Sequence, residues 1–102
     1  MFNTLYMRRK NVFDNLNYYI RELKNTVMNM DPEAEIYEFG STVNGNYNMA
    51  SDIDILIVTD KKEDIIKALW NADFKEPFEF HIRTPDESSS YFSHVKEIKK
   101  IN

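Results

Sequence analysis

The apolar run at residues 52–58 constrains the fold of this chain more than any other segment. It reads Asp-Ile-Asp-Ile-Leu-Ile-Val, and β-branched residues hold most of its positions. A run of this kind is typical of a strand inside a sheet, where other elements cover both of its faces. The chain therefore needs further strands beside this one and helices packed on them, which predicts an α/β (α+β) fold.

Helical and strand patterns elsewhere in the chain supply these neighbours. Apolar residues recur at helical spacing over residues 4–29, which predicts one long amphipathic helix that ends before Pro32. Residues 34–39 and 77–83 are expected to form strands, because they are short, rich in aromatic and β-branched residues, and bounded by Gly or Pro. Residues 62–72 are expected to form a second helix.

Two more helices complete the predicted order. A short helix is expected to begin near Ser41, and the last stretch is predicted to be a helix that Asp86 or Ser88 caps and that extends to Ile101. The elements then form a short mixed β-sheet flanked by about four helices. At 102 residues, the chain fits a single domain over residues 1–102.

Composition and charge narrow the function classes. The chain has no cysteine, so Asp, Glu and His are its strong metal ligands, which favours a hard cation such as Mg²⁺. The net charge is −4, and residues 31–60 hold seven acids without Lys or Arg, so nucleic acid is an unlikely partner. No apolar run approaches the roughly 18 residues of a membrane span. Residues 1–10 lack a signal pattern, so a cytoplasmic location is expected.

The basic residues of the first 30 positions have two interpretations. They are Arg8, Arg9, Lys10, Arg21 and Lys24. A charge run on a helix is usually an ordinary solvated face. The alternative is a docking face for an acidic partner.

The dipeptide Gly40-Ser41 follows a predicted strand directly. Glycine permits a tight turn and a close approach of backbone to a ligand, and a helix start aims free N–H groups at a phosphate. The Ser41 hydroxyl adds a further donor. An ordinary strand-to-helix turn is the alternative.

Three acids form the candidate metal site. Alternate residues of a strand share a face, so the carboxylates of Asp52 and Asp54 project together. If the two strands are neighbours, Glu79 can join them, and His81 points the same way as Glu79. Close carboxylates repel each other unless a cation or a proton lies between them, so a divalent metal is one interpretation. Solvent-exposed acids, and a hydrogen-bonded surface histidine, are the alternative.

Together these parts resemble a known family. Gly40-Ser41, the ten residues from Thr42 to Ser51, and Asp52-Ile53-Asp54 are similar to the signature of the minimal nucleotidyltransferases of the DNA polymerase beta superfamily. The second glycine, Gly45, and the apolar strand that follows also match. The resemblance covers essentially the whole chain.

The resemblance implies a fold, an activity and a set of roles. It implies the nucleotidyltransferase fold, with Gly40 and Ser41 at the triphosphate of ATP and with Asp52, Asp54 and Glu79 as catalytic residues that bind Mg²⁺, two ions being expected. It also implies transfer of AMP to a partner, since minimal members often act as the antitoxin that modifies a tyrosine of a small helical HEPN-type toxin.

One departure from the family pattern leaves other functions open. Many relatives have an Arg between the serine and the second glycine, where this chain has Thr42, Val43 and Asn44. A non-catalytic module that binds a nucleotide or a partner is therefore an alternative. A nucleotidyltransferase that acts on RNA or on a small molecule is another.

Overall fold

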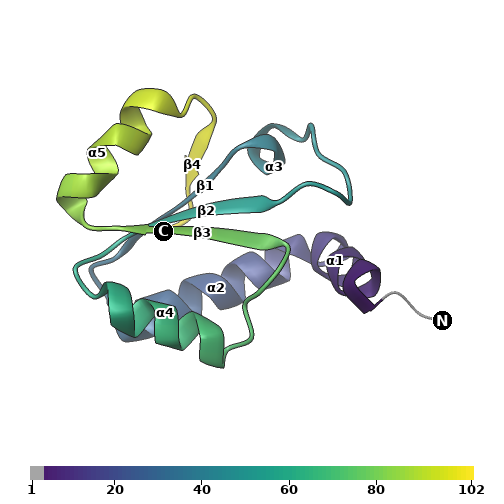
Figure 1. Cartoon of the computed structure of the whole chain (residues 1–102), viewed down its shortest axis with the longest axis horizontal. Coiled ribbons are helices and arrows are strands. Elements are labelled where there is room, and N and C mark those ends of the chain that lie inside the picture. The colour runs from purple at the N-terminus through teal and green to yellow at the C-terminus, as the bar shows by residue number, and fades with distance from the viewer. Residues whose placement is uncertain (1–3) are drawn as a thin grey trace.

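The computed structural model describes residues 4–102, which form one mixed four-stranded sheet and five helices. In chain order these are α1 (Thr4–Asp14), α2 (Leu16–Met30), β1 (Glu35–Phe39), α3 (Ser41–Asn44), β2 (Ile53–Val58), α4 (Lys62–Asn71), β3 (Phe78–Arg83), α5 (Pro85–His94) and β4 (Ile98–Lys100). The predicted fold class, a short mixed sheet flanked by helices, is confirmed (Figure 1). No helix of the described residues is long and apolar enough to cross a membrane.

The sheet has the strand order β3-β2-β1-β4. β2 lies between β1, to which it is antiparallel, and β3, to which it is parallel, while β4 is antiparallel to β1. The prediction that the apolar run at 52–58 lies inside the sheet is confirmed, and Leu56 and Ile57 are fully buried.

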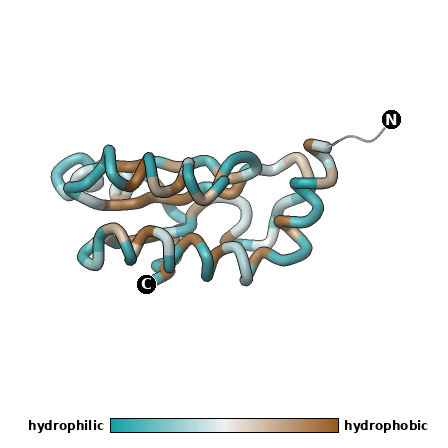
Figure 2. Tube along the Cα trace, turned by 90° about the horizontal axis from the view of Figure 1, so that it is seen from below, coloured by the Kyte–Doolittle hydropathy of each residue, from teal (hydrophilic) through white to brown (hydrophobic). Residues whose placement is uncertain are grey.

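The hydrophobic core lies between one face of the sheet and helices α2 and α4. Ile53, Ile55 and Ile57 alternate along β2 onto this face, as the period of a strand requires. The helices contribute Leu23, Val27, Ile65 and Leu69 to the same cluster. Figure 2 looks from the side of these helices, and the hydrophobic parts of the trace gather toward the middle of the molecule. The opposite face of β2 is thereby left for Asp54, and α5 lies on that side of the sheet (Figure 1).

The predicted single helix over residues 4–29 is wrong, because the chain bends at Asn15 between α1 and α2. The Asn15 side chain donates a hydrogen bond to the Asn11 carbonyl oxygen at 2.8 Å, and the Asn15 N–H bonds to the Val12 oxygen at 3.1 Å. Asparagine competes in this way for the backbone bonds of a helix, which breaks the helix at this position. α1 consequently lies at the end of the sheet while α2 runs beneath it (Figure 1).

The predicted last helix is also shorter than expected. Thr84, rather than Asp86 or Ser88, caps it: the Thr84 side chain accepts from the Glu87 N–H, and the Glu87 carboxylate accepts from the Thr84 N–H at 2.8 Å. α5 ends at His94, and Ile98–Lys100 forms β4 along the edge of β1. The free hydrogen-bonding groups of that edge favour a strand here.

Candidate active site

The parallel pairing of β2 with β3 sets Asp54 directly opposite Glu79. Asp52 lies just before β2, at the same end of the strand. The side chains of Asp52 and Glu79 are 51% and 54% exposed, while that of Asp54 is 23% exposed. The structure therefore brings the three acids predicted from the sequence to one end of the sheet, with two of them open to solvent.

The electrostatics of this cluster fit a cation. The pKa of Asp54 is raised to about 6, chiefly by burial, then by the charge and hydrogen bonding of Glu79 and by the charge of Asp52. When Asp54 is ionised, no positive charge beside it within residues 4–102 offsets the cost of removing its carboxylate from water, or its repulsion by the other acids. Oxygens of Asp54 and Glu79 lie within 4.8 Å of each other, whereas Asp52 is not part of this close group and has its Oδ1 3.8 Å from Arg9 Nη2. A divalent ion at Asp54 and Glu79 would provide this positive charge, so these two carboxylates fit the metal that the family resemblance implies.

The turn at Gly40 lies against the same carboxylate. Gly40 ends β1 with φ 82° and ψ −156°, a conformation that is essentially restricted to glycine. A Cβ atom placed on Gly40 would lie 2.6 Å from Asp54 Oδ2, which is closer than atoms in contact allow. The Gly40 N–H is anchored by a 3.2 Å hydrogen bond to the Glu97 carbonyl oxygen. α3 begins at Ser41, as predicted, so Gly40-Ser41 lies beside the acids.

The polar loop between the turn and Asp52 is held by its own side chains. Asn44 Oδ1 accepts from the Asn46 N–H at 3.0 Å, and Asn48 Oδ1 accepts from the Ala50 N–H at 2.8 Å. The Ser51 hydroxyl oxygen accepts from the Asn48 N–H at 3.1 Å. These side-chain bonds replace the backbone pairing that a loop lacks, and they fix the approach of the chain to Asp52.

Arg9 of α1 also fixes this loop. It is 8% exposed, and its guanidinium donates to the Met49 carbonyl oxygen at 2.7 Å, to the Ser51 carbonyl oxygen and to the Glu76 carboxylate at 2.7 Å. Its Nη2 lies 3.8 Å from Asp52 Oδ1. A planar guanidinium can bind several acceptors at once, so this one side chain ties α1 to the segments that lead into β2 and into β3.

The sequence interpretation of the basic residues misses this role. It groups these residues together on one helix face. The spacing of Arg9 to Val12 and Leu16, however, places Arg9 on the apolar face of the helix, and this spacing could have indicated that its side chain is buried. Arg8 and Lys10 have acidic partners as well, Asp73 at 2.7 Å and Asp14 at 2.5 Å. These contacts do not support a basic docking face on α1.

His81 is a second residue whose setting sequence reasoning does not foresee. Its Nδ1 lies 3.0 Å from the Tyr91 hydroxyl, as expected of a hydrogen-bonded histidine. The side chain is 22% exposed, however, and Nε2 points toward Asp54 and Glu79, at 3.8 and 3.7 Å from their oxygens. Burial lowers the pKa of His81, which keeps the ring neutral.

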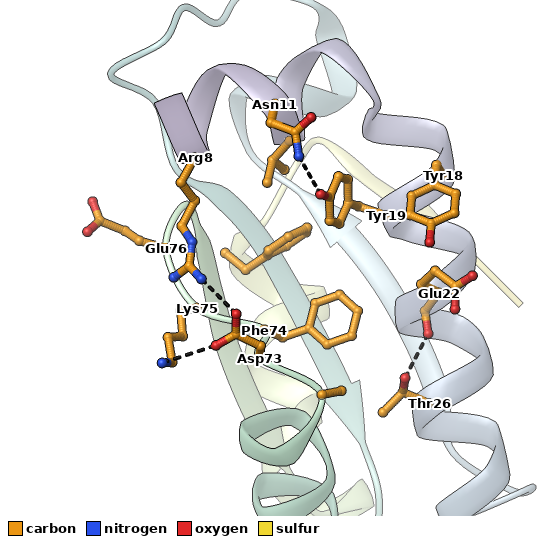
Figure 3. A pocket seen from close by; sticks show the side chains of 13 residues that line it. Arg8, Asn11, Tyr18, Tyr19, Glu22, Thr26, Asp73, Phe74, Lys75 and Glu76 are labelled. Atoms are coloured by element: carbon orange, nitrogen blue, oxygen red, sulfur yellow. Dashed lines mark hydrogen bonds and ion pairs between the residues drawn. The ribbon is translucent and has the colours of Figure 1, made fainter. Parts of the chain in front are cut away.

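A cavity of about 420 Å³ lies away from the acids, between α1, α2 and the segment that joins α4 to β3 (Figure 3). On one side Asp73 binds both Arg8 and Lys75, at 2.7 and 3.0 Å. On the other side the Asn11 amide donates to the Tyr19 hydroxyl at 2.6 Å. Asp52, Asp54 and Glu79 do not line this cavity, and Asp52 and Glu79 are about half exposed to solvent.

This chain belongs to the nucleotidyltransferase domain family, whose family model matches residues 20–101. A crystal structure named "putative nucleotidyltransferase" is 30% identical, with a TM-score of 0.67, and the match covers 82% of this chain and 98% of that one. A second, named "putative nucleotidyltransferase from Sulfolobus solfataricus", is 18% identical with a TM-score of 0.51 over 98% of this chain and 87% of that one, and it shows the same fold. A comparison with curated proteins gave no match. The family match begins after α1.

Arg9→Ala is expected to lower the free energy of unfolding by about 2–3 kcal/mol, because it leaves two partly buried carbonyl oxygens without their donor and Glu76 without its cation. Arg8→Ala, on the same helix, is the control and should change it by about 1 kcal/mol or less, because the Arg8–Asp73 pair is exposed. Urea titration measures both. Equal effects of the two substitutions would contradict the role assigned to Arg9.

Gly40→Ala and Gly45→Ala form a matched pair, because both glycines have positive φ, at 82° and 80°. A Cβ atom placed on Gly45 would have nothing within 4 Å, so its alanine variant should lose about 1 kcal/mol of stability through backbone strain alone. Gly40→Ala should lose more and should also displace the Asp54 carboxylate. Calorimetric titration with Mn²⁺ should then show weakened binding for Gly40→Ala and unchanged binding for Gly45→Ala. Unchanged binding in both variants would exclude the contact.

Asp54→Asn should stabilise the metal-free protein at neutral pH. The folded-state pKa of about 6 exceeds the ordinary value of 3.8, so the folded protein keeps a proton that the unfolded chain has lost between these values. The contribution of Asp54 to stability therefore falls as pH rises from about 4 to 6 and stays low above that range. Urea titrations in EDTA should show the variant about 1–2 kcal/mol more stable at pH 7.5 and close to wild type at pH 4. A gain that is the same at both pH values would contradict the shift.

Proposed function

We propose that this chain is a Mg²⁺-dependent nucleotidyltransferase that moves AMP from ATP to a hydroxyl group of a partner protein. The observation that carries the proposal is that Asp54 lies opposite Glu79 and against the turn at Gly40-Ser41, with Asp52 at the same end of β2, in a chain of the nucleotidyltransferase domain family. Each part alone has an ordinary structural explanation. Their meeting at one end of the sheet is what the chemistry of nucleotide transfer requires.

Each residue has a role in this proposal. Asp52, Asp54 and Glu79 are the ligands for Mg²⁺, which when bound neutralises charge on the phosphate oxygens. Gly40 lets the backbone approach the triphosphate, and Ser41 donates a hydrogen bond to it. The acceptor oxygen attacks the α-phosphorus, the bond to the β-phosphate oxygen breaks, and pyrophosphate leaves. Glu79, which is half exposed, takes the proton from the acceptor hydroxyl.

The openness of the site supports a macromolecular acceptor. Asp52 and Glu79 are each about half exposed, and the cavity beside α1 and α2 does not contain them. A second surface placed over these acids would exclude water and orient the hydroxyl that attacks. We propose a small helical HEPN-type toxin as this partner, with a tyrosine as the acceptor and this chain as its antitoxin. The family resemblance of the Gly-Ser and Asp-x-Asp motif supports this choice.

The test is co-expression of the chain with its genomic neighbour, followed by incubation of the purified pair with α-labelled ATP and Mg²⁺. The neighbour should gain label and the mass of AMP on a tyrosine. Asp52→Asn with Asp54→Asn should reduce transfer by about 10²-fold or more, because charge stabilisation at the reacting phosphate is lost. Glu63→Gln with Asp64→Asn removes two acids from the first turn of α4 and should leave transfer unchanged.

Other outcomes separate the alternatives. Label on RNA or on a small molecule would overturn the protein acceptor and retain the transferase. Binding of ATP or of the neighbour without transfer of any nucleotide would instead indicate a non-catalytic module. Equal transfer by the double Asp→Asn variant would place the reaction at another site.

A further inference from the structure

The two ring nitrogens of His81 have different surroundings. His81 lies two residues after Glu79 on β3, on the same face of the sheet, and its ring packs edge-on against Phe39 and Tyr91 at centroid distances of 5.0 and 5.5 Å. Nδ1 is 3.0 Å from the Tyr91 hydroxyl. Nε2 is buried and has no hydrogen-bond partner among residues 4–102. The ring is therefore held in place on one side and left unsatisfied on the other.

The unsatisfied nitrogen points into the acidic cluster. Nε2 is 3.8 Å from Asp54 Oδ1 and 3.7 Å from Glu79 Oε1, and both distances are too long for a hydrogen bond. One ligand atom from each of Asp54, Glu79 and His81 lies within 4.8 Å of the others. A buried nitrogen without a partner is destabilising, and native proteins rarely leave one. An ion bound among the three atoms would provide the missing partner.

We propose that His81 Nε2 is a ligand of the divalent ion held by Asp54 and Glu79, and that this nitrogen makes the site favour Mn²⁺ over Mg²⁺. The inference rests on the proposed function for the presence of a metal, and it adds a ligand and a preference. Mg²⁺ binds oxygen ligands almost exclusively, whereas imidazole suits later divalent metals. The ligand role uses the tautomer in which Nδ1 donates its proton to the Tyr91 hydroxyl, 3.0 Å away, so that Nε2 keeps its lone pair; such an outer contact is usual for a metal-bound histidine.

A charged His81 that pairs with the two carboxylates is the rival explanation. A protonated ring would draw the carboxylate oxygens to hydrogen-bond distance, since charge-assisted bonds are short. The observed distances of 3.7 and 3.8 Å leave room for an ion instead.

The test exploits the fact that the chain has two histidines, His81 and His94. His94 is exposed on α5, where its ring contacts the Ser90 carbonyl oxygen. An untagged His94→Gln variant, labelled with ¹⁵N-histidine, is loaded with Mn²⁺ without nucleotide and examined by pulsed electron paramagnetic resonance. Coupling of ¹⁵N to Mn²⁺ can then come from His81 alone. Its presence is expected, and bound Mn²⁺ without this coupling, or no binding of Mn²⁺, would overturn the proposal.

Affinities test the metal preference separately. Calorimetry should show Mn²⁺ bound at least about tenfold more tightly than Mg²⁺ by wild type and by His94→Gln. His81→Gln should weaken Mn²⁺ binding by about 10–100-fold and change Mg²⁺ binding far less. Should His81→Gln fail to fold, Tyr91→Phe removes the hydroxyl beside Nδ1 and should weaken Mn²⁺ binding more than Mg²⁺ binding, and unchanged Mn²⁺ binding by this variant would contradict the ligand role. If ¹⁵N of His81 couples to Mn²⁺ but no nucleotide is transferred, His81 is a metal ligand and the proposed function is refuted. If nucleotide is transferred but no coupling is seen, the proposed function stands and His81 is not a ligand.

Discussion

The register between β2 and β3 is the constraint on which the rest of this structure depends. Parallel pairing places Asp54 opposite Glu79, and the same alternation turns Ile53, Ile55 and Ile57 toward α2 and α4. A shift of one residue would carry the acids into the core and the isoleucines into the site. The hydrophobic effect that stabilises the core therefore also fixes the position of the carboxylates, although these carboxylates repel one another.

α1 lies before the residues that the family model matches, and it adds a contact to this arrangement. The family match covers residues 20–101, whereas Arg9 lies on α1 and holds the carbonyl oxygens of Met49 and Ser51. A buried cation 3.8 Å from Asp52 also offsets some of the negative charge that the acids concentrate. No Arg lies between Ser41 and Gly45, and Arg9 places a cation on the backbone of the loop that follows them.

Elements with a strong periodic pattern could be predicted from the sequence. Features that depend on a single side-chain hydrogen bond, or on pairing with a strand far away in the sequence, could not. The strand at 52–58 and the shared face of Asp52 and Asp54 follow from alternation, while the addition of Glu79 also requires β3 to lie beside β2. The break at Asn15 depends on a local side-chain bond, and β4 depends on the open edge of β1 about 60 residues earlier. The sequence places His81 on the acid face, but the environment of each ring nitrogen depends on Phe39 and Tyr91, which come from other elements.

The hydrogen bond from the Gly40 N–H to the Glu97 oxygen joins two distant parts of the chain. β1, β2 and β3 pair within residues 35–83, so the strands that place Asp54 and Glu79 do not depend on β4. The glycine turn, by contrast, is anchored by residue 97, which lies just before β4 at the far edge of β1. The position of the carboxylates and the position of the turn beside them are therefore held by different segments of the chain.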